Sequence, residues 1–252
     1  ARDQKGYRTQ YQYNDRGDLI SASDNNAWAL THSNSEYYRD MRQKLGIVDL
    51  AGQGKLVSQL TEVDKALLIE AFTSHYSYDD NGNLIEFTDN NGSQSSFIYD
   101  EFNNLLSSTS AEADRLITDT STEAAAKREE LGFAADVALL TEAEIIAIRA
   151  LFTTEFKYDE NQNLIERIDN GGDVTRFEYD VYGNLSKQIV FLDNNDPSQQ
   201  QVTQYFYDMF GNNIETVDAE GNHVYSTYDH LGNLIQKIDG NGGVSNFVYD
   251  KD

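Results

Sequence analysis

The chain has 252 residues, with 43 Asp and Glu against 19 Lys and Arg, a formal net charge of −24 and no cysteine. Hydrophobic residues make up 39% and aromatic residues 12%, which is enough apolar material for a folded core and argues against disorder. The acidity argues against nucleic acid as a partner. The lack of an apolar run of about 18 residues argues against membrane insertion. The lack of cysteine excludes disulfides and thiolate sites.

The dipeptide Tyr-Asp recurs seven times, and every step between successive copies is 21 residues or 21 residues plus an insertion. Tyr13-Asn14 is a degenerate further copy, and the seven tyrosines are Tyr78, Tyr99, Tyr158, Tyr179, Tyr207, Tyr228 and Tyr249. This register indicates an array of one repeated structural unit rather than one or two ordinary domains.

Each repeat contains two turn signals in which Gly follows Asp by three residues, as in Asp79 to Gly82 and Asp89 to Gly92. Asp at the first position of a type I turn accepts from the following backbone, and Gly takes the positive φ that closes the turn. The turn glycine recurs at Gly211 and Gly232 but is replaced by Asn103 and Gln162. Two strands and two tight turns per repeat predict a mainly β fold, a repetitive antiparallel hairpin or meander sheet that could spiral or form a solenoid.

The strands have two distinguishable columns of residues. Leu84 heads a column of leucines in the first strand, and an aromatic residue stands two positions before most of the Tyr-Asp tyrosines in the second. Residues two apart share one face of a strand, so neighbouring repeats stack these aromatics into a ladder. We favour core packing for this ladder, with a sugar-binding strip as the alternative.

In chain order, we expect repeats in residues 1–30, a helical insert in 31–72, repeats in 73–110, a second insert in 111–152 and repeats in 153–252, with the first and last repeats truncated. The inserts are related, because residues 42–46 (RQKLG) match residues 128–132 (REELG). Each is predicted to be an α-helical hairpin. An isolated array of this kind would expose unpaired strand edges, so we expect flanking repeats of the same protein or identical subunits end to end as partners.

Thr61 and Thr141 match as helix N-caps, each with an acidic residue three positions later. The helices that follow carry apolar residues at helical spacing. In the first insert this face is Val63, Leu67 and Phe72, and in the second it is Ile145, Ile148 and Phe152. These faces are predicted to dock on the sheet, on each other or on a neighbouring molecule.

No catalytic or cofactor-binding constellation is evident, and the four histidines lack metal-ligand or catalytic spacing. Oxygen-rich turns offer weak calcium candidates, although turn geometry alone also selects Asp and Asn. These candidates are Asp89, Asn91, Asp193 and Asp196. We therefore expect no enzyme and no cofactor other than weakly bound calcium.

The Tyr-Asp, Gly-Asn-Leu and Thr-Asp pattern, as in residues 78–100, resembles the YD-repeat or Rhs-type family, which includes Rhs toxins, shell components of Tc toxins and teneurins. The resemblance covers about two-thirds of the chain and implies a long β-sheet ribbon, spiralling into a hollow shell, in a large secreted or cell-surface protein. No counterpart of the family's self-cleaving terminal region is found. The leading hypothesis is a non-catalytic structural segment of an extracellular, adhesin-like bacterial fibre or filament. The alternatives are a wall segment of a toxin-enclosing shell and a carbohydrate-binding adhesin module that contacts surface glycans.

Overall fold

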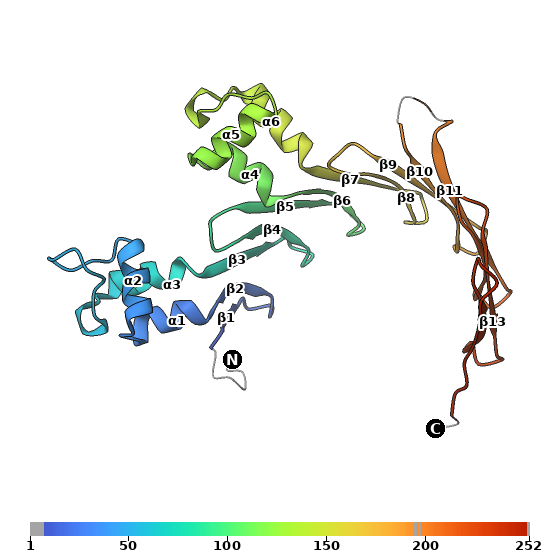
Figure 1. Cartoon of the computed structure of the whole chain (residues 1–252), viewed down its shortest axis with the longest axis horizontal. Helices are drawn as coiled ribbons and strands as arrows, with labels where there is room; N and C mark the ends of the chain where they lie inside the picture. Colours follow the sequence, from blue (N-terminus) through green and yellow to red (C-terminus); the bar gives the residue numbers. More distant parts are fainter. Residues whose placement is uncertain (1–7, 194–195, 197, 251–252) are drawn as a thin grey trace. The chain divides into compact units, whose positions relative to one another are not determined.

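Antiparallel strands and short helices make up the fold, in a computed structural model that describes residues 8–193, 196 and 198–250 (Figure 1). The chain divides into two compact units, residues 1–99 with 108–152 and residues 100–107 with 153–252. None of the helices among the described residues is long and apolar enough to cross a bilayer.

In the first unit, each strand pairs antiparallel with the next strand along the chain. The strands are β1 (Gln10–Tyr13), β2 (Leu19–Ser23), β3 (Thr73–Tyr78), β4 (Leu84–Thr88) and β5 (Gln94–Tyr99). The first helical insert lies between β2 and β3, which nevertheless pair directly. The insert is therefore looped out of an unbroken ladder.

The second unit continues the same pattern, with each of β7 to β14 paired antiparallel to its successor. Its strands are β6 (Leu105–Thr109), which belongs here through residues 105–107, β7 (Thr153–Tyr158), β8 (Leu164–Ile168), β9 (Val174–Tyr179), β10 (Leu185–Phe191), β11 (Gln200–Tyr207), β12 (Asn213–Val217), β13 (His223–Tyr228), β14 (Leu234–Ile238) and β15 (Val244–Asn246). The prediction of a mainly β antiparallel meander is confirmed.

The Tyr-Asp turns close as the sequence predicts. Tyr78 pairs with Leu84 across a bulge, and Gly82 N donates to Asp79 O at 3.2 Å with Gly82 at φ +90°. The two turns that lack this glycine hold Asn103 and Gln162 at φ 69° and 68°. Both residues thus occupy the left-handed region that glycine occupies elsewhere, where Asn is tolerated better than Gln.

Each insert contains three α-helices and a short 3₁₀-helix, rather than the predicted two-helix hairpin. The first has α1 (Asn25–His32), α2 (Glu36–Lys44), η1 (Val57–Gln59) and α3 (Glu62–Glu70). The second has α4 (Ala111–Thr118), α5 (Thr122–Glu130), η2 (Val137–Leu139) and α6 (Glu142–Leu151). The capping boxes predicted at Thr61 and Thr141 are present, with Asp64 and Glu144 as the reciprocal acceptors.

Helix α1 begins at Asn25, ahead of the residue 31 at which the first insert was expected to start. Asp24 starts it, because its carboxylate accepts from Asn26 N at 2.7 Å and Ala27 N at 3.2 Å. An eight-residue helix shows barely two turns of apolar periodicity, so its pattern is too short to separate from the preceding strand.

Each insert has its own small apolar core. Leu68 of α3 is fully buried with Leu30 and Leu60, and Phe72 packs against them. Its counterpart in α6 is Ile148, buried with Leu116 and Ala124, and Phe152 packs there. Ile145 is half-buried.

The predicted apolar face of α3 is wrong in part, because Val63 and Leu67 are 69% and 56% exposed. Leu68 lies next to Leu67 on the helix surface, and packing of α3 against α1 selects Leu68 as the inward residue. Helical spacing alone allowed either face.

Candidate functional site: the repeat ladder and its helical inserts

Tyrosines of three Tyr-Asp dipeptides, Tyr158, Tyr179 and Tyr249, tie neighbouring strands together. In the second unit, Tyr179 Oη donates to the backbone carbonyl of Leu164 at 2.9 Å, and Tyr249 Oη donates to that of Leu234 at 3.0 Å. Tyr158 Oη makes the same bond to Leu105 O at 3.0 Å, across the second insert. Burial raises the pKa of Tyr158 and of Tyr179. These hydroxyls are engaged with the backbone, which supports the packing interpretation of the ladder over the sugar-binding one.

The turn aspartates organise the loops that follow them. Asp180 Oδ1 accepts from Tyr182 N at 2.8 Å and Asn184 N at 2.9 Å, while Asn184 Nδ2 donates to Asp180 Oδ2 at 3.0 Å. The Asn184 amide is the main cause that lowers the pKa of Asp180. The same amide-to-carboxylate bond recurs in the turns of Asp79, Asp100, Asp159, Asp208, Asp218 and Asp229.

The first turn holds the same network with its two partners exchanged. Asn14 Oδ1 accepts from Arg16 N and Asp18 N, and Asn14 Nδ2 donates to Asp18 Oδ2 at 2.8 Å. The degenerate Tyr13-Asn14 copy is therefore structurally complete. The network requires one amide and one carboxylate, in either order.

Adjacent turns also contact each other in the first unit. Arg16, at the tip of the first turn, donates from Nη1 to Asp80 O and from Nη2 to Asp79 O, both at 2.9 Å. The loops of successive repeats therefore stand side by side along one edge of the sheet in this unit.

A buried arginine holds each insert together, and sequence analysis missed its role. Arg42 is fully buried and its Nη1 donates to Leu30 O at 2.6 Å and Ser33 O at 3.0 Å, at the C-terminal end of α1. Arg128 is 1% exposed and its Nη1 donates to Leu116 O and Asp119 O, both at 2.9 Å, at the end of α4. Each guanidinium thus satisfies carbonyls that a helix end leaves free and places a positive charge at the negative end of the helix dipole.

The two buried arginines differ in their remaining donors. Nε and Nη2 of Arg128 both donate to Ala135 O, at 2.9 and 2.6 Å. The same atoms of Arg42 are buried without a hydrogen-bond partner. The loop after α2 (residues 45–56) is longer than the loop after α5 and forms a small projection, here called the finger. Val48 and Gly54 form an isolated antiparallel β-bridge within it. A single signal pointed to these arginines, namely that both inserts have Arg three residues before a Leu-Gly helix stop.

The finger of the first insert packs against α2. Arg39 Nε donates to Gly54 O at 3.3 Å, and a Cβ on Gly54 would lie only 1.8 Å from Arg39 O. Glycine is therefore required at position 54 by close backbone approach. Lys55, next to it, donates from Nζ to Asp64 Oδ2 at 2.9 Å and is the main cause that lowers the pKa of Asp64 to about 2.

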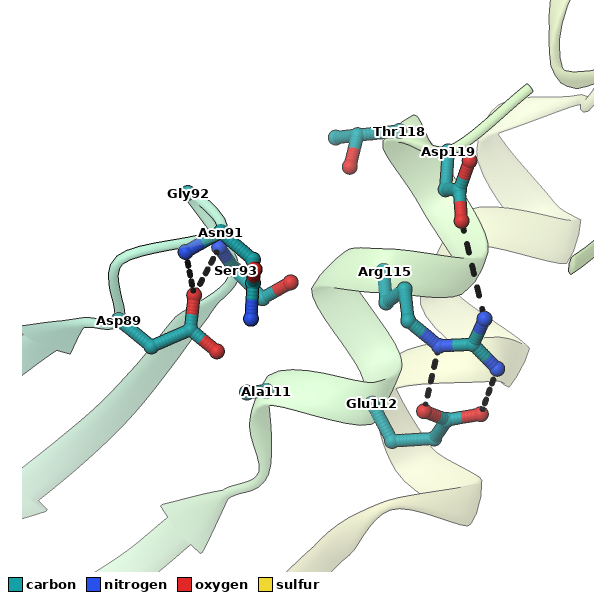
Figure 2. Close-up of a pocket in the computed structure, with 9 residues that line it drawn as sticks. All are labelled: Asp89, Asn91, Gly92, Ser93, Ala111, Glu112, Arg115, Thr118 and Asp119. Carbon is teal, nitrogen blue, oxygen red and sulfur yellow. Dashed lines mark hydrogen bonds and ion pairs between the residues drawn. The ribbon is translucent and has the colours of Figure 1, made fainter. Parts of the chain in front are cut away.

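A hollow of about 630 Å³ lies between the turn joining β4 to β5 and helix α4 (Figure 2). Arg115 occupies its wall and forms a two-bond ion pair with Glu112, both N···O distances being 2.8 Å, while its Nη1 lies 3.6 Å from Asp119. Nearby, Asp114 Oδ2 accepts from Gln94 N at 3.1 Å and so joins α4 to β5. The charged groups that line this hollow are thus paired within the second insert or within the Asp89 turn, and Asp114 beside it makes the contact with the sheet.

The calcium candidates are spread over two loops. Asp89 and Asn91 line the hollow, and Asp89 Oδ1 accepts from Asn91 N at 2.8 Å and Ser93 N at 3.0 Å. Asp196 accepts from Ser198 and Gln199, in a different loop from Asp89. Over residues 8–193, 196 and 198–250, no three or more His, Cys, Asp or Glu residues are grouped so as to hold a metal. Calcium binding stays a prediction.

Comparison with known proteins identifies the repeat. The family model described as the teneurin YD-shell matches residues 53–251, and no curated protein matches the chain. Among solved structures, a crystal structure of TcdB2-TccC3-TEV is similar at 15% identity and a TM-score of 0.42, covering 92% of this chain and 10% of that one. A Tc holotoxin pore structure from Photorhabdus luminescens with the TccC3-D651A mutation is similar at 14% identity and a TM-score of 0.34, covering 96% of this chain and 13% of that one. The chain thus spans little more than a tenth of the length of these solved chains.

The family match covers most of the chain, including both groups of full repeats, all of the second insert and part of the first. It confirms the YD-repeat resemblance that the Tyr-Asp spacing predicted. The chain belongs to the teneurin YD-shell family.

Proposed function

We propose that this chain is a non-catalytic wall segment of a large secreted YD-shell protein. The observation that carries the proposal is the repeated Tyr-to-carbonyl bond, exemplified by Tyr179 and Leu164 at 2.9 Å, in a chain that matches the YD-shell family over residues 53–251. A wall segment has to keep its strands together and does not need a site that binds and releases a substrate. Repeated hydrogen bonds between neighbouring strands provide this stability.

Three devices give the wall its strength, and each repeats along the sheet. Neighbouring strands pair through backbone hydrogen bonds, as β9 does with β10. Tyrosine hydroxyls donate to carbonyls of the neighbouring strand, as Tyr179 does, and turn carboxylates accept hydrogen bonds within their own loops, as Asp180 does. In a repeat protein stability is the sum of each repeat and its contacts with neighbours. We therefore expect flanking repeats to be the natural partners of the sheet.

The strand β15 illustrates this dependence on neighbours. It ends at Asn246, although the equivalent strand β13 continues to Tyr228, and Val248 beside it is 95% exposed. Tyr249 donates to Leu234 O, so the residues after β15 are held to β14 on one side.

A fibre or adhesin role is the second candidate, and the first insert favours it. Leu50, at the tip of its finger, is fully exposed, and Val63 and Leu67 are largely exposed on α3. Isolated exposed apolar residues are common, but several on one insert suit contact with another surface. Glycan recognition by the tyrosine ladder is disfavoured because three of its hydroxyls, those of Tyr158, Tyr179 and Tyr249, bond to the backbone.

Cryo-electron microscopy of the native assembly tests the proposal. A wall segment places this sheet within a continuous surface of further Tyr-Asp repeats and leaves both inserts attached to it. An adhesin or fibre segment instead projects from the assembly or runs along a filament axis. A sheet with both edge strands open to solvent in the native assembly contradicts the wall proposal.

A further inference from the structure

Three turns on one edge of the second unit, those after β9, β11 and β13, carry large apolar side chains at their tips. These five residues, here called the apolar turn tips, are Val181, Tyr182, Met209, Phe210 and Leu231, with exposed fractions of 92%, 87%, 89%, 80% and 73%. Three turns of the opposite edge, those after β8, β12 and β14, have only small or polar residues at the matching positions, namely Asn170, Gly171, Ala219, Glu220, Gly240 and Asn241. Turn geometry selects Asp, Asn and Gly but does not require a large apolar tip. The difference between the two edges therefore points to a surface that is covered by a partner.

The three turns that carry these tips stand side by side. A Cβ on Gly211 would lie 3.7 Å from Asn184 Oδ1 of the preceding turn. A Cβ on Gly232 would likewise lie 3.7 Å from Asn212 Oδ1. The approach of successive loops is thus the same in both steps, and the second step presents Leu231 where the first presents Phe210.

Between the first two turns lies a notch of about 260 Å³. Tyr182 and Phe210 flank it, Met209 lines it, and Asp208 and Asn184 contribute a carboxylate and an amide. Pockets for small molecules typically measure about 300–1,000 Å³, so the notch is suited to a single long side chain.

The chemistry of the notch favours a cationic side chain. Aromatic faces attract ammonium and guanidinium groups, and a carboxylate strengthens that attraction. The Asp208 carboxylate is held in place by Phe210 N at 2.9 Å and by Asn212 N and Nδ2, both at 2.9 Å. The whole second unit has 20 Asp and Glu against 6 Lys and Arg, which draws a basic partner and repels a second copy of the same acidic surface.

The repeat spacing selects the backbone conformation of that partner. Neighbouring strands lie about 4.7–4.9 Å apart, so turns on one edge recur about every 9.5 Å. A polyproline II helix has three residues per turn and rises about 3.1 Å per residue, which brings every third side chain to one face at a spacing of about 9.3 Å. A β-strand alternates its faces at every residue and does not match this spacing.

We propose that the apolar turn tips bind a basic, proline-rich segment of another protein in the polyproline II conformation, with Lys or Arg at every third residue. The cationic side chains enter the notches between successive turns, and the prolines pack on Tyr182, Phe210 and Leu231. Aromatic-lined grooves recognise such preformed, low-entropy helices in other proteins. The inference does not depend on the wall role, because it concerns a surface that this chain carries by itself.

The test is fluorescence anisotropy of a labelled (Arg-Pro-Pro)4 peptide titrated with the 252-residue chain. Saturable binding is expected, and it weakens at higher salt. The double substitution Tyr182→Ser and Phe210→Ser is expected to weaken binding at least tenfold. Asp208→Asn is expected to weaken it about three- to tenfold; it loses the bond from Asn212 Nδ2 but keeps the backbone bonds of the turn, because Asn14 Oδ1 accepts the equivalent backbone bonds in the first turn.

The controls separate this site from general attraction to an acidic protein. A peptide of the same composition with its arginines grouped together should bind at least fivefold more weakly. The double substitution Leu139→Ser and Ile146→Ser, at residues 69% and 62% exposed on the second insert, should leave binding within twofold. Circular dichroism checks that every variant is folded.

Two outcomes overturn the proposal. Equal binding of the two peptides, or of the wild-type chain and the Tyr182/Phe210 double variant, would show unspecific charge attraction. Reversible dimerisation of the wild-type chain that the same double variant abolishes would show that a second copy covers the turn tips.

Discussion

Tyr179 donates its hydroxyl to the backbone carbonyl of Leu164, 2.9 Å away and fifteen residues earlier in the chain. Tyr249 and Leu234 repeat the relationship at the same separation, and Tyr158 and Leu105 repeat it across a helical insert. One residue of the repeat thus both begins a turn and fastens the strand before it. At these three positions the hydroxyl gives tyrosine a bond that phenylalanine could not make.

Removing the hydroxyl of Tyr179 should measure how much its hydrogen bond to Leu164 O stabilises the fold. Tyr179→Phe leaves the ring in place but deprives Leu164 O of its donor, which is expected to lower the free energy of unfolding by about 0.5–1.5 kcal/mol in urea denaturation. Tyr182→Phe is the matched control, because that ring is 87% exposed. Equal effects of the two substitutions would show that the hydroxyl of Tyr179 adds no stability.

The buried arginines should differ in the cost of their removal. Arg128→Met leaves the carbonyls of Leu116, Asp119 and Ala135 without their donor and is expected to cost about 3–5 kcal/mol. Arg42→Met also removes two buried donors that have no partner, so it is expected to cost less by about 1–3 kcal/mol. Urea unfolding followed by helical circular dichroism makes the comparison. An equal or larger loss for Arg42→Met would contradict this account.

Gly54 tests the close approach of the finger to α2. Gly54→Ala would place a Cβ 1.8 Å from Arg39 O, so the finger must move away, at an expected cost of about 1–3 kcal/mol. Gly52→Ala is a control in open space, where only the positive φ of 75° is disturbed, with an expected cost of about 1 kcal/mol. The two-dimensional NMR spectrum should show displaced signals for residues 39–43 in the first variant only, and an undisturbed α2 there would refute the contact.

The turn carboxylates predict loss of stability in acid. Seven turn aspartates have a pKa lowered chiefly by the side-chain amide four residues later: Asp79, Asp100, Asp159, Asp180, Asp208, Asp218 and Asp229. Because the folded pKa lies below the unfolded value of about 3.9, this stabilisation is complete above that pH and is lost as the pH falls through the folded pKa.

Urea midpoints at pH 3 and pH 6 measure this effect. Asn184→Ala removes the amide from Asp180 and is expected to narrow the difference between the two midpoints. Ser93→Ala is the control, because the turn of Asp89 has no side-chain amide at this position and the change removes no titrating group. A pH dependence that Asn184→Ala leaves unchanged would mean that acid acts elsewhere in the chain.

The strands and turns could be predicted because their chemistry is local. An Asp with Gly three residues later specifies a tight turn without any tertiary contact, and a fixed 21-residue step carries it along the chain. Even Asn103 and Gln162 were recognised as turn residues, because the register placed them where glycine stands elsewhere.

The inserts were harder to predict because tertiary contacts decide them. Val63, Leu67 and Leu68 all lie on α3, and only packing against α1 makes Leu68 the buried residue. Arg42 and Arg128 are buried although arginine is normally exposed, and their acceptors lie nine to twelve residues earlier, at a helix end. The sequence shows which residues form the apolar turn tips, but it does not show that they lie close together. That depends on the strand order of the sheet, which decides which turns are neighbours.

Hydrogen exchange at β15 tests the wall proposal most directly. The amides of residues 244, 246 and 248, which alternate with the Phe247 amide that already bonds to Ile235 O at 3.0 Å, are compared in the isolated chain and in the native assembly. If the segment is part of a continuous wall, these amides exchange rapidly in the isolated chain and become protected at least a hundredfold in the assembly, where a further repeat pairs with this edge. Equal, rapid exchange in both states would show that the edge is open in the assembly and would contradict the wall role.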